Sequence, residues 1–112
     1  MLAESYTAVI ARGEDWVDGS TTEPYEASWA REAIVMLRAL ECGTLTEGAR
    51  AHVQVSLDGM HWADEGTSLD IPTEVDGVSM ARLGHFGHYL RLRAEMPENA
   101  TGFILATLSL KA

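Results

Sequence analysis

The strongest constraint on the fold is a run of strict alternation in the middle of the chain. Over residues 51–57, alanine, valine and leucine alternate with histidine, glutamine and serine. Successive side chains of a β-strand point to opposite faces, so this period of two predicts a strand with one buried and one wet face. Asp58-Gly59 follows at once and is the strongest short signal for a tight hairpin turn. We therefore predict a two-residue turn at Asp58 and Gly59, with residues 60–63 returning as the partner strand and Trp62 mostly buried.

Further segments have the same short, turn-bounded character. They are rich in β-branched and apolar residues, and a turn signal such as Pro97 separates each from the next. The predicted strands span residues 5–11, 78–83, 88–95 and 101–110. Six to eight short strands with turns every ~8–12 residues are typical of antiparallel sandwiches. The fold class we expect is all-β: one antiparallel, jelly-roll-like β-sandwich over residues 1–112.

Residues 28–41 fit two structures. Ala30 to Ala33 favour a helix, whereas a period of two places Ala33, Val35 and Leu37 on one face of a strand. We favour the strand, and the helix stays open. Before it, residues 13–27 carry five acids and no base, with Gly19 and Pro24 as breakers, which predicts an acidic loop or ribbon.

Charge excludes two classes of partner. The chain has 17 acidic residues against 8 basic ones, a net charge of −9, which repels phosphate backbones and anionic lipid heads. We therefore expect no nucleic acid and no membrane as partners. No secretory pattern follows Met1, and the single cysteine, Cys42, cannot form an internal disulfide. Synthesis in the cytoplasm without a signal peptide is the expectation.

Three stretches carry a resemblance to known modules. Ser56 to Trp62 reads S-x-D-G-x-x-W, Tyr89 to Arg93 reads Y-L-R-L-R, and Thr101 to Leu105 supplies a closing strand. This order resembles discoidin-like β-sandwich modules, in which the tryptophan closes one edge of the core. The ligand loops of those modules lie in a first half that has no match here, so no ligand residue is carried over.

The whole length is also similar to small β-sandwich proteins encoded among phage and prophage structural genes. These share the order of an apolar strand, V-x-V-x-x-S-x-D-G-x-x-W, a YVRVR-type strand and a closing strand. The resemblance implies a structural role in a virion, a capsid or an intracellular shell.

Catalytic and metal-binding patterns are missing from the sequence. There is no nucleophile elbow, P-loop or dinucleotide fingerprint, so we expect no enzyme and no cofactor. The acids between Asp58 and Asp76 lack the spacing of an EF-hand loop, and we expect no metal site, with calcium on loop carboxylates left open.

Two segments, residues 34–40 and 103–110, are apolar on both faces when they are read as strands. A sheet with one face in water needs apolar residues on its other face only. The acidic ribbon that carries Trp16 and Tyr25 could cover one of these stripes from within the chain. We favour a contact of one stripe with a second copy or a larger protein lattice. The interface candidates are Ile34, Met36, Leu40, Ile104, Leu108 and Leu110. Arg91 and Arg93 should point outward and pair with carboxylates of the same chain or of a neighbour.

The leading function is thus a non-catalytic assembly subunit of the decoration or cement type. The alternative is a discoidin-like ligand-binding module, with carbohydrate as the ligand that exposed aromatic side chains would stack on. The aromatic candidates are Trp16, Tyr25, Trp29 and Tyr89.

Overall fold

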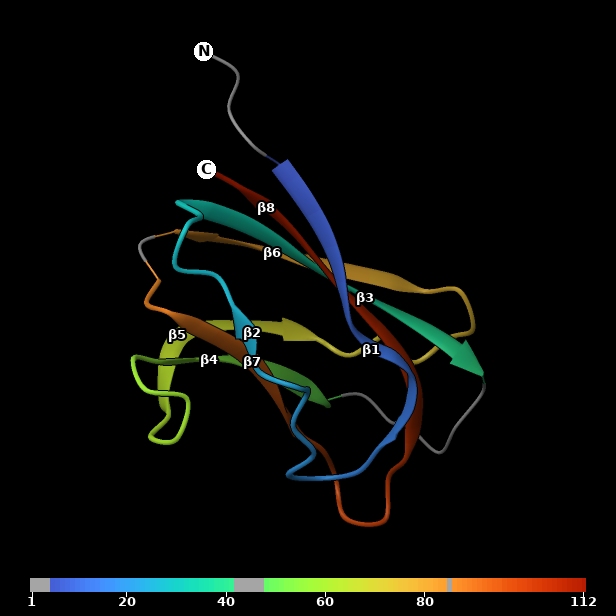
Figure 1. Ribbon diagram of the computed structural model, residues 1–112. Helices are drawn as coiled ribbons and strands as arrows, with labels where there is room; N and C mark the ends of the chain where they lie inside the picture. The colour runs from blue at the N-terminus through green and yellow to red at the C-terminus, as the bar shows by residue number, and fades with distance from the viewer. Residues whose placement is uncertain (1–4, 42–47, 85) are drawn as a thin grey trace.

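Eight strands and no helix make up the computed structural model, which describes residues 5–41, 48–84 and 86–112. The strands are β1 (Ser5–Trp16), β2 (Tyr25–Glu26), β3 (Glu32–Glu41), β4 (Arg50–Ser56), β5 (Ala63–Asp70), β6 (Val78–Gly84), β7 (Tyr89–Glu95) and β8 (Gly102–Lys111). They form two four-stranded sheets, in the orders β1-β8-β3-β6 and β2-β7-β4-β5, with every pairing antiparallel. The two sheets lie against each other as layers (Figure 1). This order is that of an eight-stranded jelly roll, and it confirms the predicted fold class.

The core lies between the inner faces of the two sheets. Strand β3 alternates as the period of two predicts: Ala33, Val35 and Leu37 are buried, whereas Ile34 and Met36 are exposed. The strand interpretation of residues 28–41 is therefore correct, and the helix is excluded for the part that β3 covers. Sheets that bury one face need this alternation, because the other face stays outside the core.

The burial of β8 side chains shows that three of the six predicted interface residues were wrongly assigned. Ile104, Leu108 and Leu110 are at most 1% exposed and lie in the core opposite the second sheet. The outward positions of β8 are instead Phe103 and the alternate residues that follow it. The sequence shows two apolar faces on this strand but not which of them is inside, and the assignment to an outer stripe was wrong.

Residues 13–27, predicted as an acidic loop or ribbon, contain the end of β1 and all of β2. Strand β1 continues to Trp16, which is 2% exposed, and Tyr25 begins β2. The segment between them runs beside β7, where Gly19 and Thr22 donate backbone hydrogen bonds to the carbonyl oxygens of Ala94 and Leu92 at 2.8 and 3.0 Å. This segment therefore extends the second sheet and does not cover the first.

Two β-bulges interrupt the pairing of β1 with β8, between Val9 and Ala11 and between Arg12 and Glu14. Gly13 lies in the second bulge with φ of +66°. A Cβ at this position would come within 3.1 Å of the Phe103 ring and 3.3 Å of Leu40, so both the backbone and the close approach require glycine.

The connection after β4 differs from the predicted turn. Residues 57–62 form a loop, β5 begins only at Ala63, and of the two turn residues only Gly59 has a positive φ, of +79°. A type I′ turn needs positive φ at both central residues, so the two-residue hairpin was wrong. Trp62 is half-buried and not mostly buried, because it lies in this loop.

Candidate functional site

A row of side chains crosses the outer face of the first sheet. The register pairs Val9 with Thr107, Thr107 with Met36, and Met36 with Met80, so the row contains one residue from each of β1, β8, β3 and β6. Val9, Met36 and Met80 are 40, 42 and 41% exposed. Long-range strand pairing thus brings three separate parts of the sequence together as one apolar strip.

Ile34 and Val78 extend this strip along β3 and β6, on the rows before and after it. We call these five exposed residues the outer patch: Val9, Ile34, Met36, Val78 and Met80. They are five of the eleven exposed large hydrophobic residues in the described part of the chain, and no residue of β2, β7, β4 or β5 is among the eleven. Exposed apolar side chains concentrated on one face are typical of interaction surfaces.

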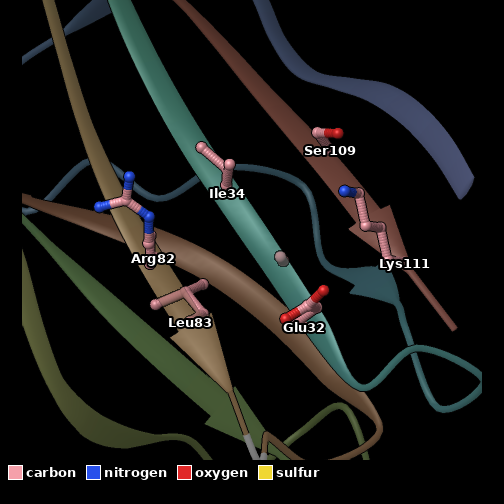
Figure 2. A pocket seen from close by; sticks show the side chains of 7 residues that line it. Glu32, Ile34, Arg82, Leu83, Ser109 and Lys111 are labelled. Carbon is pink, nitrogen blue, oxygen red and sulfur yellow. The ribbon is translucent and has the colours of Figure 1, made fainter.

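A shallow depression of about 240 Å³ adjoins the outer patch where β3, β6 and β8 meet. Figure 2 shows Ile34 and Ser109 within it, with Glu32, Arg82 and Lys111 around them. Within the described residues none of these three charged groups forms an ion pair. The depression therefore offers an apolar floor and unpaired charges of both signs.

The charge of this face differs from that of the chain. Its outward positions hold four of the eight basic residues but only three of the seventeen acidic ones. The basic residues are Arg12, Arg38, Arg82 and Lys111, and the acidic ones are Asp15, Glu32 and Glu41. A strongly acidic protein therefore has one face that is nearly neutral and partly apolar.

The outer face of the second sheet is polar and internally bonded. Arg91 donates from Nε to Oε1 of Gln54 at 2.8 Å, and Gln54 donates from Nε2 to Oδ1 of Asp64 at 3.0 Å. The guanidinium of Arg91 also lies 4.2 Å from the centre of the Trp62 ring, a cation–π contact. Burial and the neighbouring charge of Arg93 lower the pKa of Arg91. This chain of contacts crosses three strands and pairs both side-chain polar atoms of the buried Gln54.

Arg50 and His52 continue the polar face toward the far end of β4. Arg50 pairs with Asp70 and donates to the Ser68 hydroxyl. His52 Nε2 lies 3.4 Å from a carboxylate oxygen of Glu95 but is buried and has no hydrogen-bond partner among the described residues. Arg91 and Arg93 both point outward, as predicted. Across the described ranges neither forms an ion pair with a carboxylate, so their pairing with a neighbouring subunit stays a prediction.

The loop after β4 is held by its own side chains. The Ser56 hydroxyl accepts the backbone N–H of Gly59 at 2.8 Å, and Asp58 Oδ1 accepts those of Met60 and His61, each at 2.8 Å. The His61 ring lies 2.7 Å from Asp58 Oδ2. These bonds, led by the one from the His61 backbone, hold the pKa of Asp58 well below its usual range, and the hydrogen bond and charge of Asp58 raise the pKa of His61.

The predicted interface residues divide into three groups. Ile34 and Met36 are exposed and belong to the outer patch, Leu40 is half-buried beside the β1 bulge, and the three β8 residues are in the core. Sequence reasoning missed Val9, Val78 and Met80. Val9 and Met80 join Met36 only through the strand order β1-β8-β3-β6, which no local pattern reveals.

The predicted aromatic candidates are also divided. Trp16 is buried, but Tyr25 and Trp29 line an open depression of about 370 Å³ together with Ser5 and Tyr6. Tyr6 was not predicted, because it lies in β1 of the first sheet and lines this depression with Tyr25 of β2, a strand of the other sheet. Tyr89 lies on the polar face, opposite Ser56 and Glu26.

In the described segments no group of three or more histidine, cysteine, aspartate or glutamate residues could hold a metal ion. Those segments also contain no helix that could cross a membrane. Cys42 lies outside the described residues.

The strand order and the two packed sheets define the class of protein: a small antiparallel jelly roll. The crystal structure of SPBc2 prophage-derived protein YomS is similar to this chain, with a TM-score of 0.64 and 8% sequence identity over 100% of this chain and 96% of that one. At this identity the similarity shows a shared fold. Neither a protein-family model nor a curated protein sequence matches the chain.

Proposed function

We propose that the chain is a non-catalytic assembly protein, a capsid- or shell-associated subunit of the decoration or cement type. The observation that carries this proposal is the outer patch, where a row across one sheet places exposed apolar side chains of β1, β3 and β6 around Thr107 of β8. The polar second sheet shows that the chain can cover an outer face with bonded polar groups. The fold that it shares with a prophage-derived protein supports a phage particle as the setting.

Burial in an assembly would remove this apolar surface from water. Each Å² of apolar surface removed contributes about 25 cal/mol, so several methionine, valine and isoleucine side chains together give a useful docking energy. The nearly neutral charge of the face lowers the repulsion that a chain of net charge −9 would otherwise meet at an acidic partner.

The test compares two methionine substitutions in the source cells. Met36→Glu places a carboxylate in the middle of the outer patch, and Met60→Glu makes the same change in the loop after β4, where Met60 is 75% exposed. We expect the tagged wild-type chain and Met60→Glu to sediment with particles visible by electron microscopy, and Met36→Glu to remain in the slow fraction. A wild-type chain that never sediments with particles, or a Met36→Glu chain that does so normally, contradicts the proposal.

A second candidate function rests on the depression between Tyr6, Tyr25 and Trp29. Tyr6 and Trp29 are 57 and 37% exposed, and no acidic or basic side chain among the described residues lines the depression. Hydrogen bonds from Ala30 to Ala27 and from Arg31 to the Lys111 carbonyl, at 3.0 and 2.8 Å, fix the turn that carries Trp29. Aromatic faces with hydroxyl groups beside them suit the apolar faces and polar edges of neutral sugar rings.

This alternative predicts weak binding of neutral oligosaccharides. Titration of glucose- and N-acetylglucosamine-based hexasaccharides, followed by tryptophan fluorescence, should give a change that Trp29→Ala removes and Trp62→Ala preserves. If none of the sugars changes the spectrum, or if Trp29→Ala binds as the wild type does, the depression is not a carbohydrate site.

A further inference from the structure

We infer that the outer patch is covered by a second copy of the same chain, in a face-to-face contact with two-fold symmetry. The inference rests on the proposed assembly function and adds the partner and the geometry. In such a contact the same surface serves both copies, so the surface must be complementary to itself.

Charge is the first support. The face holds four basic and three acidic side chains, so two copies of it meet with little net repulsion. Most of the acidic residues lie elsewhere, and a face-to-face contact keeps these acidic surfaces on opposite sides of the dimer. A strongly charged partner would gain almost no attraction from a face that is nearly neutral, whereas another nearly neutral apolar face fits it.

The position of the apolar residues is the second support. Met36 and Thr107 are paired neighbours on β3 and β8, the two central strands of the sheet, and they occupy the row that Val9 and Met80 complete at the edges. The apolar row thus runs through the middle of the face, while Arg12 and Arg82 lie on the rows to either side. A two-fold axis through Met36 and Thr107 would place apolar groups against apolar groups.

Size is the third support. Four strands about 4.8 Å apart, with a rise of about 3.4 Å per residue over the nine residues from Phe103 to Lys111, give a face of about 500 Å² per copy. The two faces together reach about 1,000 Å², which is the lower limit for specific interfaces. We therefore expect a dimer that dissociates on dilution.

The symmetry gives a sharp cross-linking test. A residue at a two-fold axis lies next to its own equivalent in the other copy, so Thr107→Cys in a Cys42→Ser background should form a disulfide-linked dimer when oxidised by copper–phenanthroline in air. Met60→Cys in the same background is the control, because it is highly exposed and far from the outer patch in sequence and sheet. We expect cross-linking of the purified Thr107→Cys chain at least about tenfold faster than that of Met60→Cys.

Sedimentation equilibrium of the purified wild-type chain supplies the second measurement. We expect a monomer–dimer equilibrium whose dissociation constant rises at least tenfold in Met36→Glu and is unchanged in Met60→Glu. A monomer at all concentrations, or equal cross-linking of the two cysteine variants, overturns the self-docking inference. If the self-docking inference is overturned but the wild-type chain sediments with particles and Met36→Glu does not, the assembly proposal stands with a different partner on the outer patch. If the wild-type chain does not sediment with particles either, the assembly proposal fails as well.

Discussion

The outer faces of the two sheets meet solvent in different ways. On the β2-β7-β4-β5 sheet, Arg91, Gln54 and Asp64 bond to one another across three strands. On the β1-β8-β3-β6 sheet the row from Val9 to Met80 has no such bonds and leaves three apolar side chains about 40% exposed.

The difference shows which face has most of its polar groups bonded within a single chain. Polar side chains that satisfy one another gain nothing from a partner that cannot replace their hydrogen bonds. Apolar side chains in water gain from any contact that excludes water. A partner is therefore expected on the outer face of the first sheet, and the outer face of the second sheet is the surface to compare with it.

Two leucines of β8 give the largest expected difference. Leu108 is 1% exposed on the inner face, and Leu105 is half-buried on the outer face of the same strand. Leu108→Ala should reduce the free energy of unfolding by about 2–5 kcal/mol, because it leaves a cavity in the core, and Leu105→Ala should cost clearly less. Urea denaturation measures both. Equal losses would mean that the outer face of β8 is as well covered as the core.

The polar network gives the next largest effect. Gln54→Ala removes the hydrogen-bond partner of both Arg91 and Asp64, and two hydrogen bonds at about 0.5–1.5 kcal/mol each predict a loss of about 1–3 kcal/mol. Thr107→Ala, on the outer face of the first sheet, should change the unfolding free energy of the monomer by less than about 0.5 kcal/mol. A Gln54→Ala chain as stable as the wild type would show that the network does not stabilise its sheet.

Backbone conformation gives a smaller effect. Gly59→Val should destabilise by about 1–2 kcal/mol, because a β-branched residue resists the positive φ, although a Cβ would meet the Tyr89 ring only at an ordinary 3.7 Å. Gly84→Val is the matched control at the end of β6, where φ is not positive and a Cβ would meet nothing within 4 Å. Thermal melting of the two variants separates strain from the general effect of valine.

The smallest expected effect depends on pH. Asp58 raises the pKa of His61 above its ordinary 6.5, so protonated His61 stabilises the loop below pH 6.5, and this contribution is lost as the pH rises through the raised pKa. For Asp58, whose pKa is lowered, the contribution is present above pH 3.8 and is lost as the pH falls through the lowered pKa. In an NMR titration, Asp58→Asn should bring the His61 pKa back toward 6.5. An unchanged His61 pKa would mean that the pair does not form.

Local pattern was enough to predict most of the strands, but β2 was expected as loop and β5 was expected at residues 60–63. In β4 the predicted alternation held only as far as Val53, where the pairing with β5 shifts register: Gln54 and Ser56 are buried, and Leu57 is 77% exposed. In β7 and β3 the alternation predicted the buried residues, because a period of two is a property of each strand alone. It could not show which face of β8 is inner, since both are apolar and the choice depends on the neighbouring strands. The turn at Asp58 failed for a related reason: the side chains of Ser56 and Asp58 bond to the loop backbone and favour a longer loop.

The bulges of β1 have a consequence for how copies of this chain can join. β1 is an edge strand, twelve residues long, and an edge strand of that length would offer a template for strand addition and aggregation. Its two bulges and the left-handed Gly13 break the regular spacing of backbone donors and acceptors along the free edge. Growth by extending the sheet from chain to chain is thereby disfavoured at β1, and the chain remains a discrete unit.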